Sequence, residues 1–295
     1  MTIKAYNAPL AFAIILSSYS YAGSHSYTEN YTEKLSHVSS DSHIEHDSDY
    51  LKLNLSKGWF DSPAVHDHTS DNDRSRYIHP ITTEAAFNDN DFFIDYAFNK
   101  FSDEDEHEIE LELEYALTRR LGLVIETAFE FENEGGSTNE GFADLEIAAR
   151  AVLAEYEKAI VTFNVGFGIP TGNNDFSSDE LEISPSFLTW YDFGYGITFH
   201  SLIGLEIGTR SNSLEFVYES ATIKDFGGGF ALSLESQTIV DLRDDDEDED
   251  DVESNLSVGG IYRFNNSNSI RAAYTFPLTD DEFDGGAVLS YNYSF

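Results

Sequence analysis

The sequence contains no cysteine and few basic residues. Among 295 residues, 16 lysines and arginines stand against 55 aspartates and glutamates, which gives a formal net charge of −39. Without cysteine the chain has no disulfide, no zinc finger and no thiol nucleophile. So acidic a chain is unsuited to nucleic acid, and to anionic lipid headgroups unless divalent cations mediate the contact. We therefore predict no nucleic-acid partner, and no motif predicts a cofactor.

Long hydrophobic runs are also missing, and no stretch is long and apolar enough for a membrane helix. At the N-terminus, Lys4 precedes a short apolar core that runs from Ala8 to about Leu16, and small residues follow at Ser20 and Ala22. About ten apolar residues are too few for a transmembrane anchor, which needs ~20. The pattern predicts that residues 1–22 are a signal peptide and that the mature, exported chain begins at Gly23.

Residues 23–90 lack any sustained hydrophobic period and are rich in Ser, Asp, Asn and His, which predicts a polar, largely disordered N-terminal segment. A brief alternation with polar residues predicts a short hairpin or plug element at Leu51, Leu53 and Leu55. Imidazole and nearby carboxylates could bind a transition metal, although in a solvated tail histidine can simply be frequent. The weak candidates for such metal ligands are His43, His46, His66 and His68.

What the sequence does contain is a strict two-residue period. In 107–117, HEIELELEYAL, glutamates alternate with apolar residues, so a strand would place all carboxylates on one face. A helix would leave no continuous apolar stripe. Together with 23 Phe and 17 Tyr, recurring segments of this kind predict an all-β domain over 91–295. About twelve strands are expected: 92–98, 107–117, 123–131, 145–153, 161–169, 181–191, 197–207, 214–222, 230–240, 256–264, 270–278 and 287–295.

The connections between these segments alternate as well. Short ones are expected at 118–122, 154–158, 192–194, 223–225 and 265–269. Longer or strongly acidic ones are expected at 102–106, 133–140, 171–179, 209–213, 241–254 and 279–284. Short turns at one rim and longer loops at the other, with strands of ~9–11 residues, are typical of bacterial outer-membrane barrels. The sequence thus predicts a transmembrane antiparallel β-barrel in the outer membrane of a Gram-negative bacterium, with the lipid bilayer as its partner.

The polar faces of the strands suit a wet lumen, because burying unpaired carboxylates in a dry core costs several kcal/mol each. Rings of carboxylates in a pore repel anions, so we predict a passive channel for small solutes that disfavours anions. The acids could also merely solvate the lumen, and Arg263 and Arg271 on the same side could neutralise part of them. The predicted lumen-facing residues are Glu108, Glu110, Glu112, Glu114, Glu126, Glu130, Glu132, Asp144, Glu146, Arg150, His200 and Glu206.

Two motifs resemble those of known proteins. The last strand ends on Phe295 after Tyr291 and Tyr293, which is similar to the C-terminal signal that outer-membrane barrels present to their assembly machinery. The segments Gly141-Phe-Ala-Asp144-Leu145 and Gly168-Ile-Pro170-Thr171-Gly172-Asn173, followed by Pro185, resemble a family of outer-membrane transporters named after the meta-pathway of phenol degradation.

Members of that family typically show Gly-x-Gly-Asp-Leu at a strand start and Pro-Thr-Gly at a loop, and here Ala143 stands where glycine is usual. The resemblance extends best over 107–208 and implies passage of small hydrophobic or aromatic compounds. In physical terms, Pro170 ends a strand ladder and Gly172 tolerates positive φ in the loop. Glycines within 226–230 and 257–260 are expected to permit curvature or a bulge.

Two other function classes are weighed against a channel. A hydrolase would need serine, histidine and an acid on one face, but His200 and Ser201 are adjacent on a strand and face opposite ways. Carboxylate pairs are too frequent here to indicate a protease, so we predict no enzyme. A surface protein for adhesion or cation binding is suggested by the acidic run 244–251, DDDEDEDD. We interpret that run as a solvated loop, because it lacks the glycine turns of a closed calcium site.

Overall fold

A computed structural model describes residues 59–60, 66, 77–102, 104–134, 137–173, 176–243, 252–279 and 283–295. They all belong to one compact unit, Asp47–Phe295. Within these described ranges, no helix is long and apolar enough to cross a membrane. The predicted signal peptide, the leucine alternation at 51–55, the acidic run 244–251 and the candidate ligands His43, His46 and His68 lie outside the described residues.

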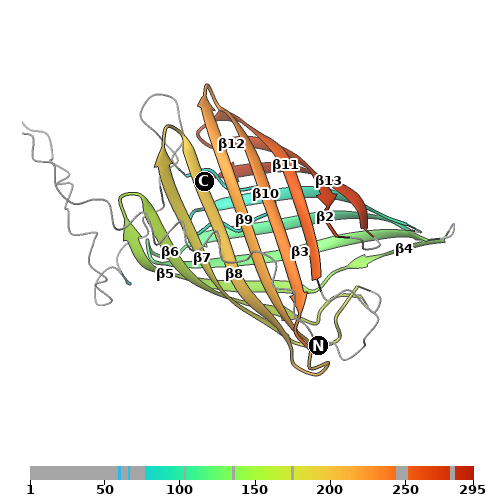
Figure 1. The fold of residues 1–295 in the computed structure, drawn as a ribbon. Coiled ribbons are helices and arrows are strands. Elements are labelled where there is room, and N and C mark those ends of the chain that lie inside the picture. Colours follow the sequence, from blue (N-terminus) through green and yellow to red (C-terminus); the bar gives the residue numbers. More distant parts are fainter. Residues whose placement is uncertain are drawn as a thin grey trace, which may run out of the picture. The chain divides into compact units, whose positions relative to one another are not determined.

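Thirteen strands form one antiparallel sheet, which closes because β1 pairs with β13 on one side and with β2 on the other (Figure 1). Twelve strands make up the barrel, and the short β4 pairs with the second half of β3, whose first half pairs with β5. The predicted closed twelve-strand barrel is therefore confirmed. The strands are β1 (Asp91–Phe101), β2 (Glu104–Ala116), β3 (Leu121–Glu134), β4 (Ser137–Phe142), β5 (Leu145–Tyr156), β6 (Ala159–Ile169), β7 (Glu182–Gly194), β8 (Ile197–Gly208), β9 (Leu214–Gly227), β10 (Phe230–Asp241), β11 (Val252–Asn265), β12 (Asn268–Pro277) and β13 (Phe283–Ser294).

Four predicted connections were wrong. The turn expected at 192–194 lies at 195–196, because β7 continues to Gly194. The turn expected at 223–225 lies at 228–229, because β9 continues to Gly227 and the positive φ angles needed to reverse the chain come from Gly227, Gly228 and Gly229. The loop expected at 102–106 shrinks to two residues, since β2 already begins at Glu104, which pairs with Glu134 of β3. Most of 133–140 belongs to a hairpin that β3 and β4 form.

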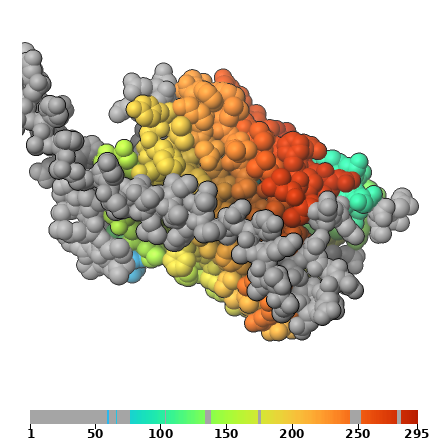
Figure 2. Space-filling model, in the orientation of Figure 1, coloured from blue at the N-terminus to red at the C-terminus, as the bar shows by residue number. Residues whose placement is uncertain are grey.

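The two faces of the barrel wall differ as the two-residue period predicts. Large apolar side chains such as Ile109 and Leu111 (41% exposed) point away from the barrel, whereas the glutamates between them line an internal cavity. Aromatic residues such as Tyr191, Tyr262 and Tyr274 are likewise exposed on other strands. Where the face in Figure 2 is coloured yellow to red, side chains of the later strands pack side by side. This apolar exterior is the surface that a bilayer would cover.

Residues 77–90, here called the plug, lie inside the barrel just before β1. Tyr77 and Ala85–Phe87 pack with inward-facing Val152, Ile160, Leu188, Trp190, Leu202 and Val217. Ile78 and Ile81 pack with a second group from β9 to β12. Composition predicts disorder for all of 23–90, but over 77–90 the structure differs, because these few apolar residues find apolar partners in the lumen. The plug has an irregular backbone without strands or helices.

A single arginine can test the outward orientation of Leu111. Leu111→Arg should lower the free energy of unfolding in lipid vesicles by roughly 2–4 kcal/mol, because a charge near the bilayer midplane loses its hydration. Glu112→Gln, one residue along the strand on the opposite face, should leave stability in lipid nearly unchanged. Urea titrations of tryptophan fluorescence would measure both values, and equal costs for the two variants would contradict the orientation.

Candidate functional site

One carboxylate of the barrel wall holds the bend of the plug at residues 81–83. Glu235 on β10 is only 1% exposed, and its oxygens accept hydrogen bonds from the backbone N–H groups of Ile81, Thr82 and Thr83 at 2.8–3.1 Å. The hydroxyl of Thr82 donates a fourth bond at 2.9 Å. Because a buried carboxylate needs several donors to replace its water, this arrangement fixes the plug and stabilises Glu235 together.

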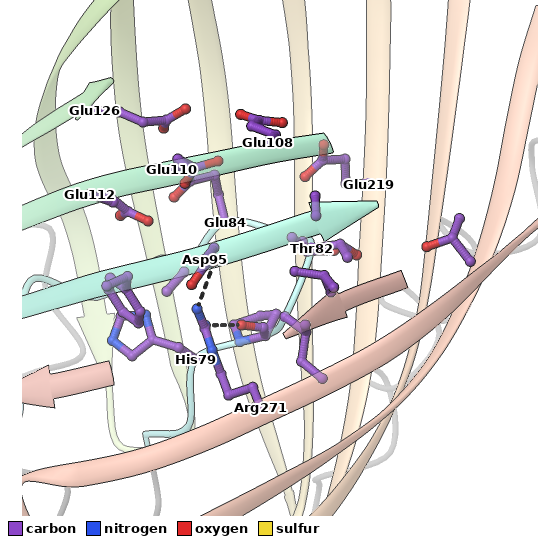
Figure 3. A pocket seen from close by; sticks show the side chains of 18 of the residues that line it. His79, Thr82, Glu84, Asp95, Glu108, Glu110, Glu112, Glu126, Glu219 and Arg271 are labelled. Carbon is purple, nitrogen blue, oxygen red and sulfur yellow. Dashed lines mark hydrogen bonds and ion pairs between the residues drawn. The ribbon is translucent and has the colours of Figure 1, made fainter. Parts of the chain in front are cut away.

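Two arginines of the wall hold the plug from opposite sides of this bend. Arg271 on β12 donates to the backbone carbonyl of Pro80 at 2.6 Å and to Asp95 of β1 at 3.3 Å, as the dashed lines in Figure 3 show. Arg150 on β5 bridges Glu84 of the plug and Glu114 of β2. Each guanidinium therefore joins a plug residue to an acidic strand.

Close packing against the barrel wall also holds the plug in place. A Cβ added to Gly259 of β11 would stand 2.3 Å from Cδ1 of Ile81, so glycine at this position makes room for the plug. The glycine was expected to serve curvature or a bulge, whereas its observed role is this close approach. Thr162 of β6 also donates a hydrogen bond to the carbonyl of Ala86. The plug is thus bonded to β5, β6, β10 and β12.

Between the plug and strands β1–β3 lies a cavity of about 340 Å³. Figure 3 shows the labelled glutamates of β2 and β3 gathered on one side of it, with Glu84 and Asp95 near its middle. Two basic side chains, His79 and Arg271, also line it. Its eight carboxylates come from Glu84, Asp95, Glu108, Glu110, Glu112, Glu114, Glu126 and Glu219.

The strand register places these acids in rows. Glu112 of β2 lies directly opposite Glu126 of β3, which lies opposite Glu146 of β5. Glu108 and Glu130 form a second pair nearer the other rim. Like charges directly opposite one another repel. These opposed pairs therefore concentrate carboxylates on one part of the lumen wall.

The other predicted lumen residues lie in different surroundings. Arg150 is buried between Glu84 and Glu114 and so serves the plug. His200 is fully buried, with its ring 6.0 Å from that of Phe87. Its neighbour Ser201 instead bonds to the hydroxyl of Thr189 at 2.7 Å, so the two residues form no dyad. Glu206 lies near the far end of β8, opposite Glu215 of β9.

Asp144 lies in the connection between β4 and β5 and holds a loop. One of its oxygens accepts from the N–H groups of Thr171 and Gly172, at 2.9 and 2.8 Å. The other accepts from the N–H and hydroxyl of Ser178, at 3.0 and 2.9 Å. Partial burial raises the pKa of Asp144, but these hydrogen bonds outweigh it and hold the pKa below its ordinary value.

The other residues of the family-like segments 141–145 and 168–173 take part in the same network of loop contacts. Leu145 donates its N–H to the hydroxyl of Thr171 at 3.0 Å, while Phe142 and Asn173 exchange hydrogen bonds. A Cβ on Gly172 would stand 2.6 Å from the carbonyl oxygen of Phe142. Glycine is needed here for close approach rather than for the positive φ that the sequence suggests, since Gly172 is not among the described glycines with positive φ. A Cβ on Gly141 would likewise clash with Phe176, and Pro170 follows β6 directly.

The hydrogen bonds that Asp144 accepts predict that the stability of this loop depends on pH. Because its pKa is lowered, the Asp144 carboxylate contributes stability above its ordinary pKa and loses that contribution as the pH falls through the lowered value. Asp144→Asn should accelerate hydrogen exchange at the Gly172 and Ser178 amides by about 10- to 100-fold at pH 7, or 1.5–3 kcal/mol. Exchange rates that match the wild type at pH 7 would contradict the role of the carboxylate.

The most unusual charged group is one that the sequence does not single out. His79 in the plug lies 2.9 Å from Asp91, and 3.8 Å from both Asp89 and Glu114. Burial lowers the pKa of His79, but Glu114, Asp89 and Asp91 outweigh it and raise the pKa to about 9. The candidate His66 instead contacts the carbonyl of Asn88 at 3.1 Å and Glu155 at 3.6 Å.

Solved structures provide the first comparison. An outer membrane channel from Pseudomonas putida F1 superposes with a TM-score of 0.59 at 15% sequence identity, covering 74% of this chain and 100% of that one. The KdgM porin in complex with disordered oligogalacturonate superposes with a TM-score of 0.51 at 12% identity, covering 69% and 99%. At such low identities these similarities support the fold alone. Among curated proteins, no match is found.

Protein families provide the second comparison. One family profile matches residues 80–295, which is more than half of the chain and includes most of the plug together with the whole barrel. The matched range contains the motif around Asp144 and Thr171 on which the resemblance rests. This chain therefore belongs to the family described as "Putative MetA-pathway of phenol degradation".

Proposed function

We propose that this protein is a passive outer-membrane channel for small solutes and that its lumen favours cations and neutral molecules over anions. The observation that carries this proposal is the cavity whose eight carboxylates face two basic side chains. In a confined, weakly screened space, such an excess of one charge repels anions and raises the local concentration of cations.

The plug is the proposed gate. It is bonded to the wall through Glu235, Arg271 and Arg150, and it borders the acidic cavity. Conduction in this proposal therefore requires the plug to shift, and the described structure corresponds to the closed state. Because these bonds involve charged groups that are buried, the closed state is expected to predominate.

Location and partners follow from the same proposal. The exposed apolar side chains of the strands suit a lipid bilayer, and Phe295, at the end of β13 and 54% exposed, suits recognition by the barrel-assembly machinery. Membership of the family and the similarity in fold to channels and porins support transport rather than catalysis. The solute class implied by the resemblance, small hydrophobic or aromatic compounds, fits an acidic cavity best when the compound is neutral or cationic.

Reversal potentials in a salt gradient test the selectivity. The refolded mature protein should pass K⁺ in preference to Cl⁻ in planar bilayers. Glu112→Gln combined with Glu126→Gln removes two opposed charges of one row and should lower the permeability ratio several-fold towards one. Glu157→Gln makes the same chemical change in an exposed turn and should not alter it. A ratio near one in the wild type, unchanged in the double variant, would exclude cation selectivity.

A further inference from the structure

The surroundings of His79 join the plug to the barrel wall. His79 and Asp89 belong to the plug, whereas Asp91 begins β1 and Glu114 lies near the end of β2. Asp91 and Glu114 are direct partners in the β1–β2 register, so their side chains lie on the same face. The ring of His79 packs against Phe87 at 4.7 Å and Phe93 at 5.2 Å between centroids, which fixes its orientation.

The acidic side chains of this cluster are buried. Asp89, Asp91 and Glu114 are each at most 3% exposed, so three carboxylates surround one imidazole away from water. Arg150 bonds to one oxygen of Glu114 and is shared with Glu84. The second oxygen, Oε2 of Glu114, is buried, and among the described residues it accepts no hydrogen bond. It lies 3.8 Å from Nε2 of His79.

The ligand atoms are spaced as a metal ion requires. One ligand atom each from His79, Asp91 and Glu114 lies within 4.8 Å of the other two. Ligands about 2.1 Å from a tetrahedral ion are roughly 3.4 Å apart. The distances from Nε2 of His79 to Asp91 and Glu114, 2.9 and 3.8 Å, lie on either side of that value. Small side-chain shifts would therefore bring all three into coordination.

We propose that His79, Asp91 and Glu114 bind a first-row divalent cation such as Zn²⁺, with Asp89 close enough to be a fourth ligand. The ion would displace the proton of the His79 imidazole. A deprotonated imidazole combined with carboxylates suits Zn²⁺ or Mn²⁺ better than Ca²⁺ or Mg²⁺, which take oxygen ligands alone. The ion would fasten the plug to β1 and β2. If the plug is the gate, as proposed above, the bound ion adds a metal-dependent bond that holds the gate closed. The metal site itself does not depend on which solute the channel passes.

Metal content of the untagged, full-length mature protein tests the site. The protein is refolded in detergent, equilibrated with Zn²⁺, Mn²⁺ or Ca²⁺ and freed of weakly bound ions. Elemental analysis and isothermal titration then count the ions bound. The histidines at 43, 46 and 68 could bind metal elsewhere, so His43→Gln/His46→Gln/His68→Gln serves as the background chain.

In that background we expect one tightly bound Zn²⁺, weaker Mn²⁺ and no Ca²⁺. His79→Gln should remove the ion, and Asp91→Asn should weaken it at least 10-fold, whereas His107→Gln, at the opposite end of β2, should bind as the background does. Heat-modifiable migration in gels verifies that each variant is folded. A background chain without Zn²⁺ would overturn the proposal, and so would a folded His79→Gln variant that retains the ion. Because binding is measured without conduction, a failed site and a failed channel function are distinguishable.

Discussion

Glu235→Ala is expected to convert a mostly closed barrel into a frequently open one. The variant removes the acceptor of four hydrogen bonds from residues 81–83 of the plug while leaving the β9–β10–β11 ladder intact. Hydrogen bonds to a charged group contribute about 1.5–3 kcal/mol each and are not additive, so a loss of about 3–5 kcal/mol in plug docking is reasonable. Each 1.4 kcal/mol is a factor of ten, so open probability should rise about 10²- to 10³-fold.

Single-channel recordings of wild type and variant at equal protein density would measure this increase. Gln237→Ala is the matched control, because Gln237 lies two residues along the same face of β10 and bonds to Glu219 rather than to the plug. Far-UV circular dichroism should show an unchanged barrel for both variants. Equal open probabilities for Glu235→Ala and Gln237→Ala would show that the plug bend is not what closes the lumen.

Arg150→Met should destabilise the barrel itself. The substitution preserves much of the side-chain volume but leaves the Glu114 and Glu84 carboxylates without their shared guanidinium. Removing one partner of a buried ion pair costs about 3–5 kcal/mol, because the other charge stays buried. Urea unfolding in lipid vesicles with EDTA present would measure the loss. Arg210→Met, in an exposed loop, should cost less than about 0.5 kcal/mol.

A second substitution shows whether Arg150→Met loses stability through an uncompensated charge or through lost packing. Arg150→Met combined with Glu114→Gln removes the orphaned charge, so the double variant should recover a large part of the stability that the single variant loses. If the double variant is as unstable as the sum of the two single variants, the loss comes from packing rather than from an uncompensated charge.

The barrel was predictable because its signal is local and repeated. Each strand carries its own alternation, and even where β9 ran past its predicted end, the residues up to Asp225 kept the period. Turn positions were less certain, since glycine serves both turns and close packing. Gly227–Gly229 reverse the chain, whereas Gly259 admits Ile81. Only the three-dimensional neighbours of a glycine separate these roles.

The plug was not predicted because its contacts are non-local. Ile78, Ile81 and Phe87 follow no period, and each is buried by residues far along the chain. One signal could have indicated it. Several inward positions of the barrel, such as Val152, Leu188 and Trp190, are apolar in a lumen that was otherwise expected to be wet. Apolar side chains at those positions imply that some other part of the chain covers them.

Pairing of β1 with β13 also sets the order of assembly. It is the seam of the barrel and joins the first and last strands, so it carries the largest loop-closure cost and should form late. The plug runs directly into β1, and Pro80 is bonded to Arg271, 191 positions away. A barrel whose seam closed first would have to thread this tethered segment into a finished lumen. Insertion of the plug into the lumen and pairing of β1 with β13 are therefore expected to occur in one kinetic step. The plug then serves as the template around which the last strand docks.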